Sequence, residues 1–385
     1  MRVVDSPHRE GIEFKYDVLV YAQGDIPPGL NETTDTTEEP AKYNGWRLRA
    51  RETISLSEDA TSPSSNHAGG RITYHFATPN RYLQWFRGPD QGRAVISNYL
   101  RDLFSPGLRR LGEETGLNPL LIWWDCASPA MTEMPWELAF YRTFNNSVTL
   151  LRGVPPQAPR PPTVFYGKLR LAVIGQHEDS LWNSAAWLSL ENHPLLEVHR
   201  FDGIDPILAL QKAAQEGFEL VHLFSRGEIT SAFDGVLYLN DGQSREYNRE
   251  LTSGHLSEIL RYGRVALVSL TSNAELDDTP VPDIVATHRA FAALGRTPVA
   301  LPSVLAPLGY LPIDRATAYF VAFYDTLSAT GDLGYASNTA QRAARSLTPV
   351  AVFPRRSSNV ITRKLSVRDI MNDSTLSDFL PAEVL

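Results

Sequence analysis

FELVHLFSRGEI, residues 218–229, joins a run of apolar residues to a polar ending. The apolar part has the length and composition of a strand that is covered on both faces of a sheet. Ser225, Arg226 and Gly227 follow it and predict a short turn. Polar turns at strand ends often carry functional residues. The residue here is an arginine, which stays protonated near neutral pH and accepts no proton. The segment is therefore either an active site or the remains of one.

Short apolar runs of the same kind recur toward the C-terminus, and helical segments separate several of them. The helix expected over 205–217 has clear end signals, because Asp205 is a capping residue, Pro206 suits the first turn and Gly217 suits the end. Alternation of this kind predicts a mostly parallel α/β sheet with helices on both faces. The expected strands cover 118–126, 168–175, 195–201, 219–225, 264–272 and 297–303, and the other helices cover 253–263 and 281–295, both ending at glycine.

The N-terminal region has a different character, with β-branched and aromatic residues in partial alternation. Strands are expected over 12–22, 46–56, 71–76 and 82–88, and a helix over about 93–112. Five prolines within 154–165 predict a semi-rigid connection. We therefore expect a β-rich segment over 1–90 that packs on or extends the sheet, an α/β domain over 91–348 and a polar tail over 349–385.

The composition limits the class of protein. Of 385 residues, 43% are hydrophobic, which is enough for a sizeable core. The net charge of -8 argues against nucleic acid and against an anionic membrane surface as partners. A single cysteine, Cys126, suits a reducing compartment. There is neither a signal-peptide pattern nor a membrane-spanning apolar run, so a cytoplasmic protein is predicted.

The common cofactor motifs are missing from the sequence. It contains no phosphate-binding glycine loop, no serine-hydrolase elbow and no zinc-peptidase motif. His193 and His199 flank Pro194, but no third ligand accompanies them. We therefore expect no metal and no cofactor.

Three segments together resemble the CHAT domains, which are caspase-like cysteine peptidases found mainly in bacterial intracellular proteins. EMPWELAFY (133–141) resembles the family's PWE signature, here Pro135, Trp136 and Glu137. LVHLFSRGEI (220–229) matches the strand and turn that carry the family's catalytic histidine, and RVALVSLTSNAE (264–275) matches the strand that carries its cysteine. The order and spacing of these and quieter features extend the resemblance over residues 90–347.

The resemblance implies a caspase fold and places Arg226 at the histidine position and Thr271 at the cysteine position. A cysteine peptidase depends on a thiol with a pKa near 8.5 and an imidazole that takes its proton. A threonine hydroxyl is far less acidic, and a guanidinium supplies only donors. Loss of both groups lowers the rate by about 10⁴ to 10⁶. Since both positions fall at the carboxyl ends of parallel strands, Arg226 and Thr271 are expected to be neighbours.

Individual residues near this pair have more than one interpretation. Arg226 either pairs with Glu228 or Glu275, or recognises a carboxylate of a partner protein. His222 is interpreted as a core histidine bonded to a neighbour rather than as a base. The PWE residues are interpreted as a fold device in which the proline fixes a turn, the indole packs and the carboxylate accepts backbone hydrogen bonds, with direct binding as the alternative.

The sequence therefore predicts a catalytically inactive CHAT-like pseudopeptidase that binds another protein in a bacterial proteolytic or antiviral defence assembly. The partner would be an active peptidase, a substrate or an inhibitor-like chain. Two alternatives stay open: a hydrolase with Thr271, Ser272 or Cys126 as nucleophile, and a sensor that binds a small anionic ligand at Arg226. The binding candidates are Ser225, Arg226, Gly227, Thr271, Ser272, Asn273 and Glu275.

Overall fold

The computed structural model of the protein describes the greater part of the C-terminal two-thirds of the chain and several N-terminal strands. The described residues are 2–10, 13–22, 47–57, 120–126, 136–137, 148–153, 163–175, 189–230, 234–240, 247–272, 281–296, 301–309, 311–345, 350–354 and 361–364.

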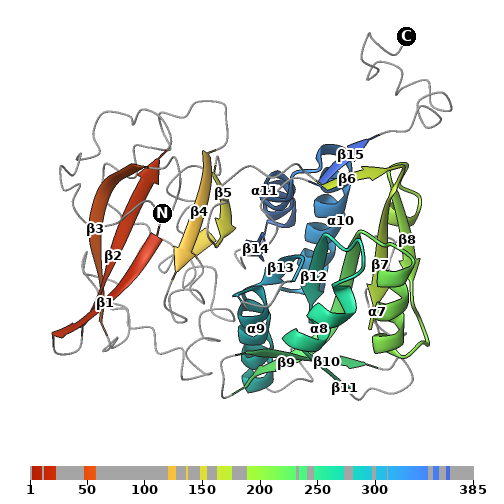
Figure 1. Cartoon of the computed structure of the whole chain (residues 1–385), viewed down its shortest axis with the longest axis horizontal. Coiled ribbons are helices and arrows are strands. Elements are labelled where there is room, and N and C mark those ends of the chain that lie inside the picture. The colour runs from red at the N-terminus through yellow and green to blue at the C-terminus, as the bar shows by residue number, and fades with distance from the viewer. Residues whose placement is uncertain are drawn as a thin grey trace, which may run out of the picture.

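The molecule is an α/β protein built on one large mixed sheet (Figure 1). The strands follow one another in the order β11-β10-β9-β12-β13-β14-β5-β4-β1-β2-β3. In addition, β7 pairs with β9, and β8 pairs with β7. A separate parallel pair is formed by β6 and β15. The strands are β1 Arg2–Glu10, β2 Glu13–Ala22, β3 Arg47–Ser57, β4 Leu120–Cys126, β5 Val148–Arg152, β6 Thr163–Tyr166, β7 Leu169–Ile174, β8 Leu196–Arg200, β9 Leu220–Ile229, β10 Gly235–Asn240, β11 Tyr247–Thr252, β12 Leu267–Thr271, β13 Ser303–Pro307, β14 Val350–Phe353 and β15 Ile361–Lys364.

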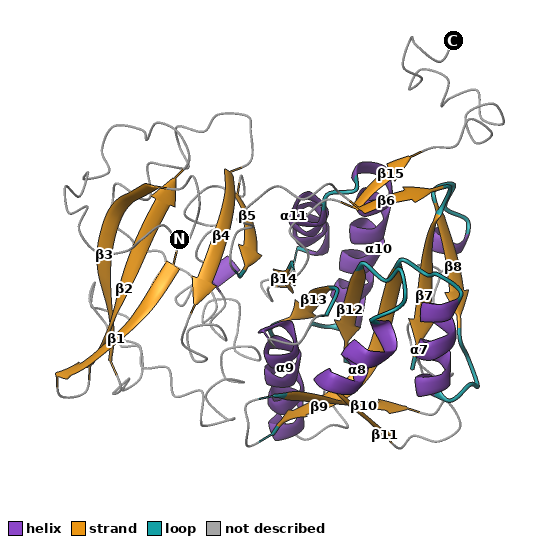
Figure 2. Cartoon of the chain, in the orientation of Figure 1, coloured by secondary structure: helices purple, strands orange, loops and turns teal. Residues whose placement is uncertain are grey.

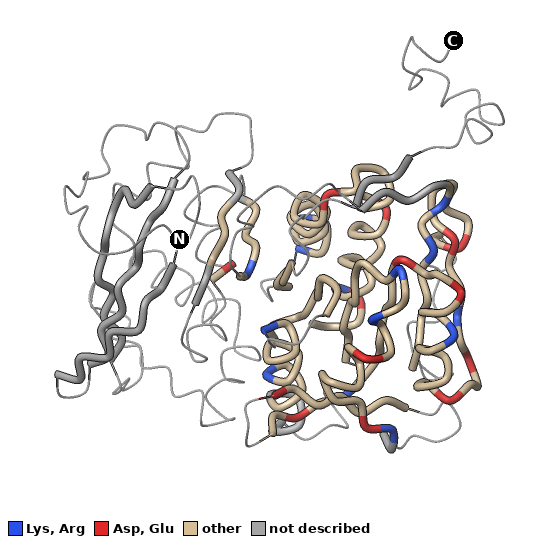
Figure 3. Tube along the Cα trace, viewed as in Figure 1, with Lys and Arg blue, Asp and Glu red and all other residues tan. Residues whose placement is uncertain are grey.

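The centre of the sheet is parallel, as the strand–helix alternation predicts. β8, β7, β9, β12 and β13 all run in the same direction, whereas β14 and β10 run against their neighbours β13 and β9. Every residue of β12 and β13 is buried. Neither strand contains a charged residue, and the charged residues coloured in Figure 3 belong to other parts of the chain.

Helices cover both faces of this sheet, which confirms the predicted layering (Figure 2). Leu171, Leu220 and Phe224 point to one face and pack against α10 and α11. Val221 and Leu223 point to the other face and pack among residues of α7, α8 and α9. Since the two sets alternate along β9, each strand supplies side chains to two cores. The helices are α7 Pro206–Gln215, α8 Ser253–Leu260, α9 Val281–Arg296, α10 Ile313–Thr330 and α11 Leu333–Ala344.

The helix ends follow their sequence signals with two differences, the first of which is that α8 ends at Leu260 and not at the predicted Gly263. The Asp205 carboxylate accepts from the backbone N–H groups of Ile207 and Leu208, as the capping prediction requires. The cap of α8 is Thr252, whose hydroxyl accepts from His255. The second difference is that α9 continues past Gly295 to Arg296. Gly295 is buried beside the Phe353 ring, where an added Cβ would lie 2.5 Å from a ring carbon, so its role is close packing rather than helix termination.

Several strand boundaries differ from the sequence prediction. Of the strand expected over 297–303, residues 297–300 lie outside the described residues, and the strand found here is Ser303–Pro307, whose register with β12 begins at Ser303. β1 was not expected, and β14 lies within the predicted polar tail yet is buried between β13 and β5. Strands β2 and β3 occur as expected. The predicted strands 71–76 and 82–88 and the helix 93–112 lie outside the described residues. Within the described residues no helix has the length and apolar character needed to cross a membrane.

Candidate functional site

The segment that opened the sequence analysis forms one continuous strand, so the predicted turn at Ser225, Arg226 and Gly227 is wrong. β9 runs through these residues to Ile229. Its first half pairs with β7, and from Ser225 onward it pairs with β10. Backbone hydrogen bonding therefore continues where a turn was expected, and the reversal comes between Ile229 and Gly235, the paired residues that end β9 and begin β10.

Two glycines permit this exchange of neighbours. β7 ends before Gly175, which has a φ of +77° and where an added Cβ would lie 2.7 Å from the Phe224 carbonyl oxygen. A side chain at this position would push β7 away from β9. At Gly227 an added Cβ would lie 2.8 Å from the Ala290 Cβ, so helix α9 packs directly on the strand. The Gly227 N–H donates to the Thr287 hydroxyl of α9 over 3.1 Å.

The structure brings Arg226 and Thr271 to neighbouring strands on one face of the sheet. Thr271 is the last residue of β12 and lies opposite Phe224 in the parallel register. Arg226 is two residues further along β9, and strand alternation gives it the same face as Phe224 and Thr271. Arg226 is half-buried, whereas Thr271 is 4% exposed.

The nearest functional group to the Thr271 hydroxyl is an imidazole. The Nε2 atom of His222, one strand away on the same face, lies 3.0 Å from Thr271 Oγ1. The Nδ1 atom of the same ring lies 2.9 Å from the Tyr324 hydroxyl of α10. We call this the Tyr324–His222–Thr271 chain. It joins β12, β9 and α10 through three buried side chains.

The surroundings of the ring keep it uncharged. His222 is fully buried, and its ring stacks on Phe224 at 4.8 Å and contacts Phe320 edge-on at 4.6 Å between centroids. Burial lowers the pKa of His222 to about 3, because an imidazolium loses its hydration there. Burial likewise raises the pKa of the Tyr324 hydroxyl above its usual range. Both hydroxyls are able to donate and to accept, so they satisfy a neutral ring in either tautomer.

This geometry has the contact of a nucleophile–base pair but not its electrostatics. A hydroxyl 3.0 Å from an imidazole nitrogen is the arrangement required for proton transfer. A working base must become an imidazolium, which the usual triad stabilises with a carboxylate on the second nitrogen. In this protein the second nitrogen meets a phenol. With its pKa at about 3, the ring is on the order of a thousandfold weaker as a base than an ordinary histidine.

The remaining candidates of this region are divided between the two faces. Ser225 is buried and, like Gly227, alternates to the face that α9 covers. Ser272 is half-buried and follows the end of β12. Asn273 and Glu275 lie outside the described residues. Of the two acids predicted for Arg226, Glu228 accepts a hydrogen bond of 2.5 Å from the Tyr238 hydroxyl. This hydrogen bond is the largest of the effects that raise the pKa of Tyr238 to about 12.

In the PWE signature the partner of the Glu137 carboxylate is a side chain, whereas backbone hydrogen bonds were expected. Glu137 receives both donors of a bidentate pair from Arg152 of β5, Nε at 2.7 Å and Nη2 at 2.6 Å. Both side chains are buried. The Trp136 indole is fully buried and lies 4.8 Å from the Trp124 ring of β4, so its packing role is confirmed. The ion pair was not predicted, because no local sequence signal indicates that Arg152 of β5 faces Glu137. Pro135 lies outside the described residues.

Cys126 is remote from this site. It ends β4, which the sheet order separates from β12 by β13, β14 and β5. At the usual spacing of neighbouring strands this is about 19 Å across the sheet. The imidazole of His222 therefore cannot serve a nucleophile at Cys126.

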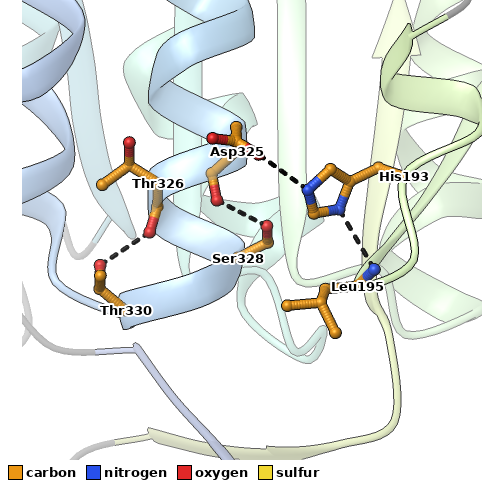
Figure 4. Close-up of polar contacts among 6 residues, drawn as sticks. All are labelled: His193, Leu195, Asp325, Thr326, Ser328 and Thr330. Carbon is orange, nitrogen blue, oxygen red and sulfur yellow. Dashed lines mark hydrogen bonds and ion pairs between the residues drawn. The ribbon is translucent and has the colours of Figure 1, made fainter. Parts of the chain in front are cut away.

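The two histidines considered as metal ligands have other partners. His193 Nδ1 accepts from the Leu195 N–H over 3.1 Å, so the proton of a neutral ring is on Nε2, which lies 3.0 Å from Asp325 of α10 (Figure 4). His199 instead lies against the Phe201 ring, 4.5 Å between centroids. Across the described part of the chain no three acidic, histidine or cysteine side chains form a potential metal site.

Comparison with protein-family models gives no matching family, and comparison with curated proteins gives no significant match. The CHAT resemblance therefore remains a prediction from short segments of the sequence.

Proposed function

We propose that this protein is a catalytically inactive, caspase-like CHAT-type pseudopeptidase that binds another polypeptide. It acts as a regulatory subunit of a cytoplasmic bacterial proteolytic or antiviral defence assembly. The partner is an active peptidase, or a substrate or inhibitor-like chain held at the carboxyl-terminal edge of β9 and β12.

One observation is the main support for the proposed loss of catalysis. The hydroxyl at the position that corresponds to the family's cysteine is buried and bonded to His222, whose pKa is lowered to about 3. Arg226, at the position that corresponds to the histidine, adds a permanent positive charge on the same face. Neither group is suited to remove a proton from Thr271 near neutral pH.

The location of Arg226 supports the binding role. It lies on the face of β9 that continues past the end of β12, where binding sites of parallel sheets are usual. A guanidinium there is suited to a carboxylate of a bound chain.

The test is co-purification from cells that contain the native neighbours. Tagged protein is expected to retain one polypeptide in fixed proportion, and Arg226→Ala is expected to lose it. Arg315→Ala is the matched control, because Arg315 is an exposed arginine of α10 that bonds the Ala344 carbonyl. Equal retention by both variants would contradict the proposed role of Arg226, and failure to retain any polypeptide would contradict the binding function.

The 3.0 Å contact between His222 and Thr271 favours a second candidate, a slow hydrolase with Thr271 as nucleophile and His222 as base. This candidate requires turnover of peptide or ester substrates that disappears in both Thr271→Val and His222→Phe. Absence of turnover, or turnover that survives either substitution, rejects it.

A further inference from the structure

We infer that the Tyr324–His222–Thr271 chain is a lock that holds the side chain at position 271 inside the core. His222, and not Arg226, then determines what this position can do. The inference rests on the proposed function, because only there is position 271 a former nucleophile position.

The lock is built from three elements that are far apart in sequence. His222 and Tyr324 are 102 residues apart, and His222 and Thr271 are 49 residues apart. Both ring nitrogens have a hydroxyl partner, and two aromatic rings pack against the imidazole. The ring cannot turn without leaving buried polar groups unsatisfied, so its orientation is fixed.

The direction of the Thr271 hydroxyl follows from this fixed ring. Thr271 is 4% exposed and its Oγ1 is directed at His222. A nucleophile must also reach a bound substrate, and a hydroxyl that is 4% exposed does not reach one unless its side chain moves outward. The contact with the buried ring, together with this burial, therefore withholds the group from any chain bound at the edge of the sheet.

The register explains why His222 rather than Arg226 has this effect. His222 lies opposite Ser269 in the stretch of β9 that pairs with β12. Arg226 lies opposite Tyr238, in the stretch that pairs with β10. The imidazole thus belongs to the part of β9 that flanks Thr271, and the guanidinium belongs to the hairpin beyond it.

Cysteine accessibility tests the lock directly. In a Cys126→Ser background, Thr271→Cys and Ser272→Cys are compared for the rate of reaction with a small aromatic disulfide reagent at pH 8. The lock predicts that the thiol at 271 reacts at least about tenfold more slowly than the thiol at 272, because reaction requires local opening. Equal rates would overturn the inference.

Release of the lock is the second measurement. Adding His222→Phe to Thr271→Cys is expected to accelerate labelling about tenfold, and adding Tyr324→Phe, which removes a single oxygen, is expected to accelerate it less. Arg226→Ala is the matched control on the same strand and is expected to leave the rate unchanged. If neither His222→Phe nor Tyr324→Phe accelerates labelling, the inference fails, and acceleration by Arg226→Ala alone would show that the lock is assigned to the wrong residue.

The pH dependence separates a lock from a base. A thiol at 271 that reacts faster than the one at 272, and stays reactive below pH 7, would show that His222 takes its proton. That result would overturn the lock and favour the hydrolase. Co-purification of the partner is independent of all these rates, so failure of the lock is distinguishable from failure of the proposed function.

Discussion

Among the described residues, two buried groups of polar side chains are of opposite kinds. Glu137 and Arg152 form a bidentate ion pair beside Trp136. The Tyr324–His222–Thr271 chain is also buried, but it is neutral because burial lowers the pKa of His222 to about 3. In the first, removal of one partner leaves a charge in the core. In the second, removal of one partner leaves only an uncharged polar group that has lost a hydrogen bond. The comparison shows that the core holds polar side chains either as a compensated pair of charges or as a neutral hydrogen-bonded group.

The largest effect is expected at the ion pair. Glu137→Ala leaves the Arg152 guanidinium buried without this carboxylate, and the free energy of unfolding should fall by about 3–5 kcal/mol. Denaturant unfolding monitored by tryptophan fluorescence measures it. The double variant Glu137→Leu with Arg152→Met should recover much of the loss, because no charge then remains. A loss below about 1 kcal/mol in the single variant would contradict the structural role of the pair.

The next effect is a pH dependence that belongs to His222. The pKa of His222 is about 3 in the folded protein and about 6.5 in the unfolded chain. Its neutral form therefore contributes stability in full above about pH 6.5, and this contribution is lost as the pH falls toward 3. The loss is at most about 1.4 kcal/mol per pH unit.

The variant His222→Phe isolates this contribution, because it cannot titrate at position 222. Its unfolding free energy should approach that of the unmodified protein as the pH falls from 6.5 to 4.5. A difference that stays constant over this range would mean that His222 is not held in its neutral form.

A smaller effect is expected at the end of the chain of hydrogen bonds. Thr271→Val preserves the shape of the side chain but leaves His222 Nε2 without this hydroxyl, which should cost about 1–3 kcal/mol. Ser272→Ala, one residue further on, should stay within about 0.5 kcal/mol. Denaturant curves at pH 7 compare the two. Equal losses would show that the Thr271 hydroxyl has no special partner.

No effect is expected from small anionic ligands. Nucleotides screened by melting temperature should leave the transition unchanged, because the proposed ligand of Arg226 is a polypeptide. A rise with one nucleotide that disappears in Arg226→Ala would favour the sensor alternative, by linkage between binding and folding.

The fold was predictable where a local signal agreed with the tertiary structure. The apolar run before Ser225 and the Asp205 cap both predict their elements correctly. The turn at Arg226 was wrong because pairing with β10, a non-local interaction, extends a strand through polar residues. β14 was missed for the same reason, since four residues become a strand only between two others.

The candidate site was predictable in its positions but not in its contacts. The parallel arrangement of β9 and β12 places Arg226 and Thr271 on neighbouring strands, as expected. Strand alternation also places His222 on the same side of β9 as Arg226, because residues 222, 224 and 226 share one side. Tyr324 and Arg152 carry no such signal, because Tyr324 reaches His222 through the packing of α10 on β9, and Arg152 reaches Glu137 from β5.

The most direct measurement is the intact mass of the protein after treatment with a peptidyl electrophile that modifies hydroxyl and thiol nucleophiles, followed by peptide mapping. A protein that has lost its base should give no adduct at Thr271 or Ser272 at neutral pH. A stoichiometric adduct at Thr271 that is absent from His222→Phe would contradict the account and show that the imidazole still activates the site.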